Sequence, residues 1–187
     1  VPFEQNIFKK TFANGSQIYF RSETQLDSIR GIAVKQNMFD EIQDIPSDSI
    51  PIIIETMSGQ EDENDPFLAR AGTIWYAGTP KSINNPIEQI WQSSRQIVPV
   101  IVCDAGHHNI PNLEMIQPEG LLCTKCKSRV NVREAYFKAM GNKDSDTAGF
   151  WLPQVVFPIH TESEKKWRVL YKKKMNYPKE KFLNEVM

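Results

Sequence analysis

Three cysteines and two adjacent histidines lie close together in the second half of a 187-residue chain. Cys123 and Cys126 form a Cys-x-x-Cys pair, and Cys103 stands shortly before His107 and His108. Zinc takes four nitrogen or sulfur ligands in tetrahedral geometry, which two short ligand pairs separated by a loop can supply. We therefore predict a zinc site of Cys103, His107, Cys123 and Cys126, with His108 as the alternative to His107. The other interpretation is three thiols without metal and a solvent-facing histidine pair.

The expected role of this zinc is structural, because four protein ligands leave no position open for water. Its binding energy would order a segment with little core of its own. An odd number of cysteines argues against a closed disulfide framework and favours reduced thiols around a metal.

A second candidate site is the acidic pair Asp40-Glu41, which lies at the end of a strand predicted over residues 33–39. Adjacent strand residues diverge, so one carboxylate could hold Mg²⁺ through water while the other polarises an attacking water. The next predicted strand, residues 72–77, ends in Gly78-Thr79-Pro80. Ligands of open α/β sheets bind beyond such strand ends. The alternatives are a surface helix start for the pair and a simple turn for Gly78-Thr79-Pro80.

Strands alternating with helices predict an α/β fold with a largely parallel sheet. Asn14-Gly15 predicts a hairpin turn within residues 11–20. The pattern predicts an acidic loop over residues 60–66, a strand over 98–102 and irregular chain over 103–131. It further predicts a strand over 149–157, broken at Pro153. Helices are expected over residues 49–57, 86–94, 162–174 and 178–186.

Composition is that of an ordinary folded domain, with 40% hydrophobic and 24% charged residues and a net charge of −1. It argues against long disorder, collagen and coiled coil, and no apolar run is long enough to span a membrane. Residues 165–181 form a basic run in which Trp167, Leu170, Tyr171 and Met175 make an apolar stripe that should pack into the core. Lys172, Lys173 and Lys174 are candidates for DNA contact; a solvated surface is the plainer interpretation.

The ordered set of motifs resembles the large subunit of a tailed-phage terminase, the ATPase of the DNA-packaging motor. The resemblance covers most of the chain, from the Walker B region to the linker. It rests on these stretches: residues 12–18, Ile29-Arg30-Gly31, Asp40-Glu41-Ile42-Gln43-Asp44, Ala77-Gly78-Thr79-Pro80, the cysteine-rich segment and Phe182-Leu183-Asn184-Glu185-Val186.

The resemblance implies part of an ASCE-type ATPase parallel sheet with a zinc-knuckle-like insertion and C-terminal helices. Asp40 would match the Walker B aspartate, Glu41 the catalytic glutamate and Gly78-Thr79-Pro80 the coupling motif. The implied divisions are residues 1–97 for the C-terminal half of the ATPase core, 98–132 for a zinc-ribbon-like insertion and 133–187 for a linker subdomain with basic helices. Mg²⁺ and ATP would be cofactors of the complete protein.

The same resemblance implies double-stranded DNA, a portal protein and a small terminase subunit as partners, in the cytoplasm of an infected bacterial host. The chain has no G-x-x-x-x-G-K-[ST] phosphate loop, which the family carries upstream, and the family's nuclease domain would lie downstream. The missing initiator Met also predicts a processed chain or a fragment. We therefore expect no ATP hydrolysis by this chain alone.

Two other functions are compatible with the same residues. A zinc-ordered nucleic-acid-binding or adaptor module without catalysis needs only the Cys/His segment and the basic run. A fragment of another ASCE ATPase or helicase would also carry an acidic pair and a coupling loop.

Overall fold

The computed structural model describes residues 4–22, 24, 26–57, 72–81 and 84–187, and the chain divides into two compact units. Unit 1 is Val1–Gly78 and unit 2 is Thr79–Met187. This division differs from the predicted boundaries after residues 97 and 132. The predicted acidic loop over residues 60–66 lies outside the described residues.

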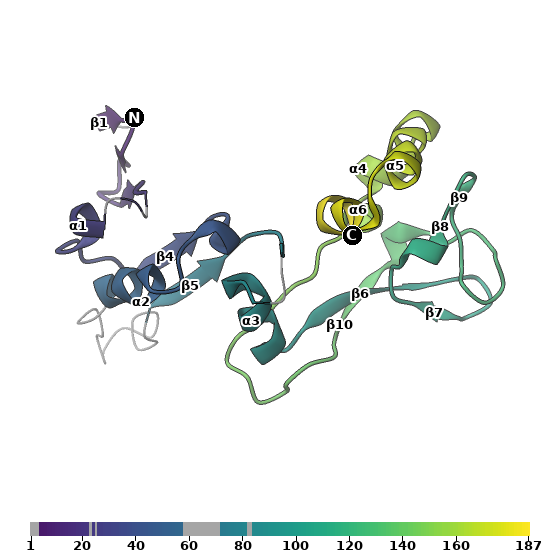
Figure 1. The fold of residues 1–187 in the computed structure, drawn as a ribbon, viewed down its shortest axis with the longest axis horizontal. Coiled ribbons are helices and arrows are strands. Elements are labelled where there is room, and N and C mark those ends of the chain that lie inside the picture. Colours follow the sequence, from purple (N-terminus) through teal and green to yellow (C-terminus); the bar gives the residue numbers. More distant parts are fainter. Residues whose placement is uncertain (1–3, 23, 25, 58–71, 82–83) are drawn as a thin grey trace. The chain divides into compact units, whose positions relative to one another are not determined.

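Unit 1 begins with a three-stranded antiparallel meander of short strands (Figure 1). Its strands are β1 (Glu4–Asn6), β2 (Lys9–Thr11) and β3 (Gln17–Tyr19). The backbone N–H of Phe12 donates to the Ser16 carbonyl at 2.9 Å, and Gly15 has φ +82°. Because a left-handed conformation favours glycine, Asn14-Gly15 makes the predicted turn.

The rest of unit 1 is one parallel β-α-β arrangement. Strand β4 (Gln36–Phe39) pairs in parallel with β5 (Thr73–Tyr76), with Phe39 opposite Tyr76. Between them in the chain lie α2 (Ser49–Ile54) and the 3-10 turns η2 (Ile42–Asp44) and η3 (Glu55–Met57); α1 (Leu26–Ile29) precedes β4. The Asn37 amide donates to the Ile53 carbonyl at 3.1 Å, which ties α2 to β4.

The two faces of the β4–β5 pair differ in how far their side chains are buried. Phe39 and Tyr76 stack with ring centroids 5.3 Å apart, and Phe39 is buried. On the other face the cross-strand neighbours Met38 and Trp75 are 78% and 56% exposed. The strand predicted over residues 72–77 is present as β5, but its apolar run is not buried throughout, since side chains alternate between the faces of a strand.

The first helix of unit 2 is α3 (Pro86–Ser93), and the side chain of the preceding residue, Asn85, caps its first turn. The Asn85 side chain accepts a hydrogen bond from the Glu88 N–H at 3.0 Å, and Pro86 occupies the first helical position. Strand β6 (Ile97–Val102) follows and pairs antiparallel with β10 (Tyr136–Ala139) and β7 (His108–Asn109). A small hairpin of β8 (Ile116–Gln117) and β9 (Gly120–Leu121) follows the turn η4 (Leu113–Met115).

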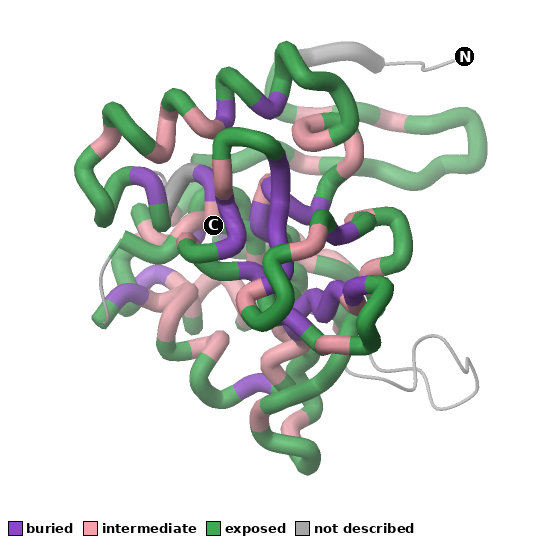
Figure 2. Tube along the Cα trace, turned by 90° about the vertical axis from the view of Figure 1, so that its right-hand side faces the viewer, coloured by how far each residue is buried: buried purple, intermediate pink, exposed green. Residues whose placement is uncertain are grey.

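Three helices complete unit 2, and the first and third of them pack against the second. They are α4 (Pro158–Thr161), α5 (Glu164–Asn176) and α6 (Lys179–Val186), preceded by the turns η5 (Val132–Glu134) and η6 (Gln154–Val156). The buried residues of one core cluster come from both the strands and these helices. They are Ile101, Cys103, Met115, Ile116, Leu121, Cys123, Val130, Val155, Val156, Trp167, Leu170, Phe182 and Val186. Figure 2 colours the buried residues of the described chain purple.

Two side chains of α5 bind the β8 backbone directly. The Trp167 indole N–H donates to the Gln117 carbonyl at 2.8 Å, and the Lys174 ammonium donates to the Ile116 carbonyl at 2.5 Å. Trp167 and Leu170 are buried, as the predicted stripe required, but Met175 is 64% exposed. The prediction that Met175 packs into the core is therefore wrong. Met175 is the penultimate residue of α5, where the helix ends.

The fold is mixed α/β, as predicted, but a largely parallel sheet is not present among the described residues. Apart from β4–β5 and an isolated bridge between Ile97 and Phe150, the described strand pairs are antiparallel. Most connections are short turns, and a parallel pair needs a crossover of a dozen residues or more. In place of a strand over residues 149–157, the turn η6 follows Pro153. Strand β10 was not predicted, although Tyr136-Phe137 is β-prone.

Trp167 offers a direct test of how α5 is held. Replacing Trp167 with Ala should lower the free energy of unfolding of unit 2 by about 3–5 kcal/mol, because a buried aromatic side chain and its hydrogen bond are lost. Val169, 54% exposed on the same helix, is the control, and Val169→Ala should change that free energy by less than about 0.5 kcal/mol. Urea unfolding followed by circular dichroism measures both; equal midpoints for W167A and wild type would refute the packing described.

Candidate metal centre and acidic strand edge

Two hairpin tips in unit 2 bring the predicted metal ligands together. The first tip joins β6 to β7, where the Cys103 N–H donates to the His107 carbonyl at 3.1 Å and the Gly106 N–H to the Cys103 carbonyl at 2.7 Å. Gly106 has φ +77°, a left-handed conformation that suits glycine. The turn places the Cys103 sulfur and the His107 ring on the same side, and the His107 N–H lies 3.4 Å from that sulfur.

The second tip follows β9 and has a similar construction. The Cys123 N–H donates to the Ser128 carbonyl at 2.8 Å, and the Lys127 N–H donates to the Cys123 carbonyl at 3.1 Å. Lys127 adopts φ 60°, and a bridge between Leu122 and Arg129 closes the base of the tip. The Cys-x-x-Cys pair therefore sits on a tight turn that is fixed by backbone hydrogen bonds.

The four ligand atoms of Cys103, His107, Cys123 and Cys126 all lie within 4.8 Å of one another. The Cys103 sulfur is 3.6 Å from the Cys126 sulfur. His107 Nδ1 is 3.5 Å from the Cys103 sulfur and 3.7 Å from the Cys123 sulfur. With zinc–sulfur bonds of about 2.3 Å and zinc–nitrogen bonds of about 2.0 Å, a tetrahedron separates its ligand atoms by about 3.5–3.8 Å. The cluster therefore has the dimensions of a tetrahedral metal site and can hold a metal ion.

His108 does not join this cluster. His108 is the first residue of β7 and directly follows His107. Its Nδ1 lies 2.9 Å from the Tyr136 hydroxyl, and the two rings meet edge to face. Successive strand residues point to opposite faces, so only one of the two histidines can face the cysteines. The structure thus selects His107 of the two candidates.

Asn109 supports both tips and was not singled out from the sequence. Its buried amide donates to the His107 carbonyl at 2.9 Å and to the Ile101 carbonyl at 3.3 Å. Its carbonyl oxygen accepts from the N–H and the hydroxyl of Thr124, both at 3.1 Å. Asn109 therefore links the first tip to the second. A polar residue two positions after the ligand His107 was the only signal for it.

The surroundings favour thiolates, which are the metal-binding form of cysteine. Burial raises the pKa of Cys123, but hydrogen bonds from the backbone of Cys126 and Lys125 and from the Cys126 and Asn109 side chains lower it, for a net pKa of about 6. Hydrogen bonds from the Ser128 hydroxyl and N–H lower the pKa of Cys126. Hydrogen bonds to the sulfurs of Cys126 and Cys123 raise the pKa of His107.

The acidic pair of unit 1 lies at the carboxyl end of β4, next to the end of β5. The Ala77 N–H donates to the Phe39 carbonyl at 2.8 Å, and the Ile42 N–H donates to the Ala77 carbonyl at 3.0 Å. These bonds continue the parallel ladder and hold Asp40 and Glu41 beside the chain that leads to Gly78. Both carboxylates are exposed.

Glu41 is held in an unusual conformation. Its φ of 50° lies in the left-handed region, which is unfavourable for a glutamate and is found preferentially at functional sites. The Gln43 amide donates a hydrogen bond to the Glu41 carboxylate. A Cβ at Gly78 would meet the Gln43 Oε1 at 2.1 Å and the Ile42 Cγ2 at 3.1 Å, so a larger residue there would displace the Gln43 side chain. Gln43 was not predicted as a site residue.

The remaining predicted site residues lie elsewhere. Thr79 and Pro80 follow Gly78 at the start of unit 2, in chain without regular secondary structure. Lys172 is exposed and Lys173 is half-buried, whereas Lys174 is used in the contact with β8. Among the helices of the described chain, none has the length and apolar character that crossing a membrane would take.

Comparisons with protein-family profiles, with curated proteins and with solved structures give no match to this chain.

Metal content should depend on His107 and not on its neighbour. The purified chain is expected to carry one zinc per molecule, and His107→Ala or Cys123→Ser should reduce this well below one, because the tetrahedron loses a ligand. His108→Ala is the matched control and should keep the full content. Elemental analysis by mass spectrometry provides the measurement. Loss of zinc in H108A with retention in H107A would contradict the ligand assignment.

Zinc affinity should begin to weaken once the pH falls below about 6, and zinc release should follow at lower pH. Protons compete with zinc for thiolates, and the Cys123 pKa of about 6 leaves this ligand deprotonated above that pH. Asn109→Ala removes one of the hydrogen bonds that lower this pKa, so zinc release should begin at a higher pH than in the wild type. A zinc-sensitive dye can follow release across a pH series, with Asn142→Ala as the exposed control. An unchanged midpoint for N109A would contradict the assigned role of Asn109.

Proposed function

We propose that the chain is part of a viral DNA-packaging motor ATPase of the terminase large-subunit type. In this function it supplies the Walker B carboxylates and the coupling motif for ATP-driven translocation of double-stranded DNA. The observation that carries the proposal is the parallel register of β4 and β5. It brings Asp40-Glu41 and Ala77-Gly78 to one edge of a sheet, where nucleotide-hydrolysing α/β folds have their reacting groups.

The roles follow from the positions of the side chains. Asp40 directly follows the last residue of β4 and is exposed, as a carboxylate that holds Mg²⁺ through water must be. Glu41 is exposed on a left-handed backbone, and the Gln43 amide donates a hydrogen bond that orients its carboxylate. Such a carboxylate can accept a proton from an attacking water. ATP with Mg²⁺ would supply the phosphoryl group that is cleaved.

In this proposal, the coupling motif Gly78-Thr79-Pro80 moves when the acidic pair Asp40-Glu41 moves and transmits that movement to the chain that follows it. Gly78 packs against the same Gln43 that binds Glu41, so a movement of Glu41 would displace the backbone at Gly78. Thr79 and Pro80 would carry this movement onward in the chain. In the complete protein, the partners would be double-stranded DNA, a portal protein and a small terminase subunit, in an infected bacterial host.

Zinc is the metal that the second site fits best. Three cysteine sulfurs and one imidazole nitrogen form a ligand set that is common in structural zinc sites. Soft thiolates disfavour magnesium and calcium, which prefer oxygen. We propose that zinc has a structural role in fixing the two tips and the β8–β9 hairpin.

A second candidate function is favoured by this same cluster. A zinc-ordered nucleic-acid-binding or adaptor module needs the metal centre and the basic helix α5 but no catalysis. The two candidates differ in whether Asp40 and Glu41 have any chemical role.

Glu41→Gln distinguishes the candidates when it is introduced into a longer chain that also carries a phosphate loop. The variant should reduce ATP turnover by about 10²-fold or more while ATP binding is kept, because an amide cannot accept the proton of the attacking water. Asp48→Asn is the control, since it removes one exposed acidic charge from the same unit. Phosphate release and nucleotide binding are measured for both. Wild-type turnover in E41Q would exclude the catalytic role of Glu41 and favour the adaptor module.

A further inference from the structure

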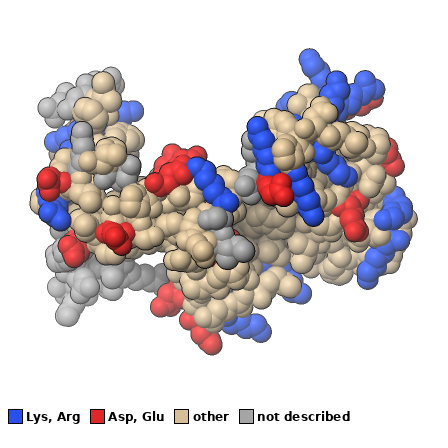
Figure 3. All heavy atoms as spheres, viewed as in Figure 1, with Lys and Arg blue, Asp and Glu red and all other residues tan. Residues whose placement is uncertain are grey.

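The helix α5 presents a basic outer face that no part of the metal centre or the acidic edge uses. Its thirteen residues include six basic side chains and one acidic one, although the net charge of the whole chain is −1. Trp167 and Leu170 bury the opposite face in the core of unit 2. Figure 3 shows Lys and Arg atoms gathered around the helical part of unit 2.

Four of the six basic residues of α5 lie on two opposite sides, with Lys174 inside and Lys165, Arg168 and Lys172 as an outer group, while Lys166 and Lys173 lie between these sides. The Lys174 ammonium lies 2.5 Å from the Ile116 carbonyl, and burial lowers its pKa. Lys165 and Lys172 are exposed and, in the part of the chain that the structure describes, make no hydrogen bond or ion pair. Arg168 lies between them in the chain and bonds to Glu164 at 2.5 Å, with both side chains mostly exposed.

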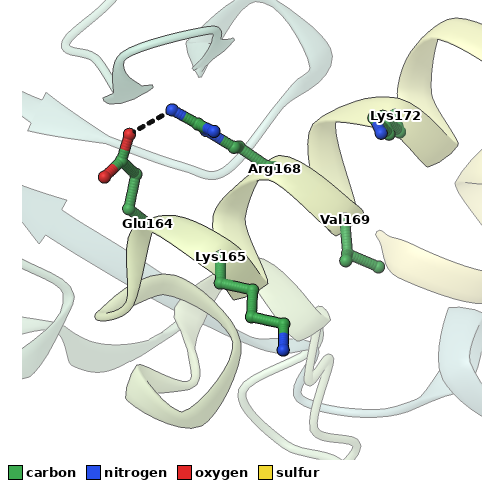
Figure 4. A pocket seen from close by; sticks show the side chains of 5 residues that line it. All are labelled: Glu164, Lys165, Arg168, Val169 and Lys172. Atoms are coloured by element: carbon green, nitrogen blue, oxygen red, sulfur yellow. Dashed lines mark hydrogen bonds and ion pairs between the residues drawn. The ribbon is translucent and has the colours of Figure 1, made fainter.

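The outer group lines a shallow hollow of about 300 Å³ on one helix surface (Figure 4). Residues 165, 168 and 172 are spaced i, i+3 and i+7, so they share a face over about 10 Å of helix length. The two other lining residues are Glu164 and Val169. Figure 4 shows the Glu164–Arg168 bond as a dashed line and no such bond at either lysine.

This chemistry suits a regular row of phosphates better than bases. Duplex DNA carries one negative charge per about 1.7 Å of its axis, so a row of cations about 10 Å long faces several phosphates. The hollow has no aromatic ring on which an unpaired base could stack. It also has no amide side chain of the kind that reads base edges.

We propose that the outer face of α5 binds the phosphate backbone of duplex DNA through Lys165, Arg168 and Lys172, without sequence preference. Lys174, which the sequence placed among the DNA contacts, instead holds the helix to β8. Glu164 opposes binding, both by its charge and by its bond to Arg168. The proposal rests on the charge and exposure of α5 and is independent of the ATPase function of Asp40 and Glu41.

The test measures binding of the zinc-loaded full chain to a fluorescent 20-base-pair duplex, by anisotropy, over a series of salt concentrations and without nucleotide. Each phosphate contact contributes about 0.9 to the slope of log K against log salt, or about eightfold in affinity at 0.1 M salt. Lys165→Gln with Lys172→Gln should therefore weaken binding about 60-fold and reduce the slope by about 1.8. Glu164→Gln should strengthen binding.

The matched control is Lys138→Gln with Lys143→Gln, which removes the same charge from exposed positions in and after β10. Its affinity should stay within about twofold of the wild type. Equal weakening in both double variants would overturn the proposal, because binding would then follow net charge and not the α5 face. No duplex binding by the wild type, with binding of polyglutamate to the same face, would overturn it in favour of an acidic protein partner. Circular dichroism of each variant checks that α5 remains folded.

Discussion

The convergence of four ligand atoms at two hairpin tips is the constraint on which unit 2 depends. Cys103 and Cys123 belong both to this cluster and to the buried core. Backbone hydrogen bonds fix each tip and Asn109 links them, but three thiolates within 4.8 Å of one another would repel. A metal ion removes this repulsion and makes the segment between the tips part of the core.

The consequences extend from the tips to the C-terminal helices. The chain between the two tips forms β8 and β9, and the backbone carbonyls of β8 receive hydrogen bonds from Trp167 and Lys174. These two contacts set which face of α5 is inside and therefore which lysines are outside. The structural zinc that we propose would thus determine, through β8, the surface that we propose for DNA.

Unit 1 depends on a different constraint, the parallel register of β4 and β5. A shift by one residue would exchange the faces of Phe39 and Met38, so the stacked Phe39–Tyr76 pair fixes the register. That register also fixes Asp40 and Glu41 beside Ala77.

Several local features could be predicted from the sequence. They are the Asn-Gly turn, the helix that begins at Pro86, the Cys-x-x-Cys pair and the strands before the acidic pair and Gly78. Each depends on residues close together in the chain that favour a turn, a helix start, a strand or metal binding.

The features that were missed depend on long-range contacts. The choice of His107 over His108 follows from which face of β7 meets the second tip, and Asn109 has its role only because that tip is near. The direction of strand pairing and the exposure of Met175 likewise depend on distant partners.

Hydrogen exchange tests the central claim, that the metal centre holds α5 in place. Backbone amides around Trp167 and Leu170 should be protected in the zinc-loaded chain and should lose most of this protection when a chelator removes the metal, because the β8 carbonyls are no longer fixed. Amides of α2 in unit 1 should be unaffected. Unchanged protection of α5 in the metal-free chain would contradict the account.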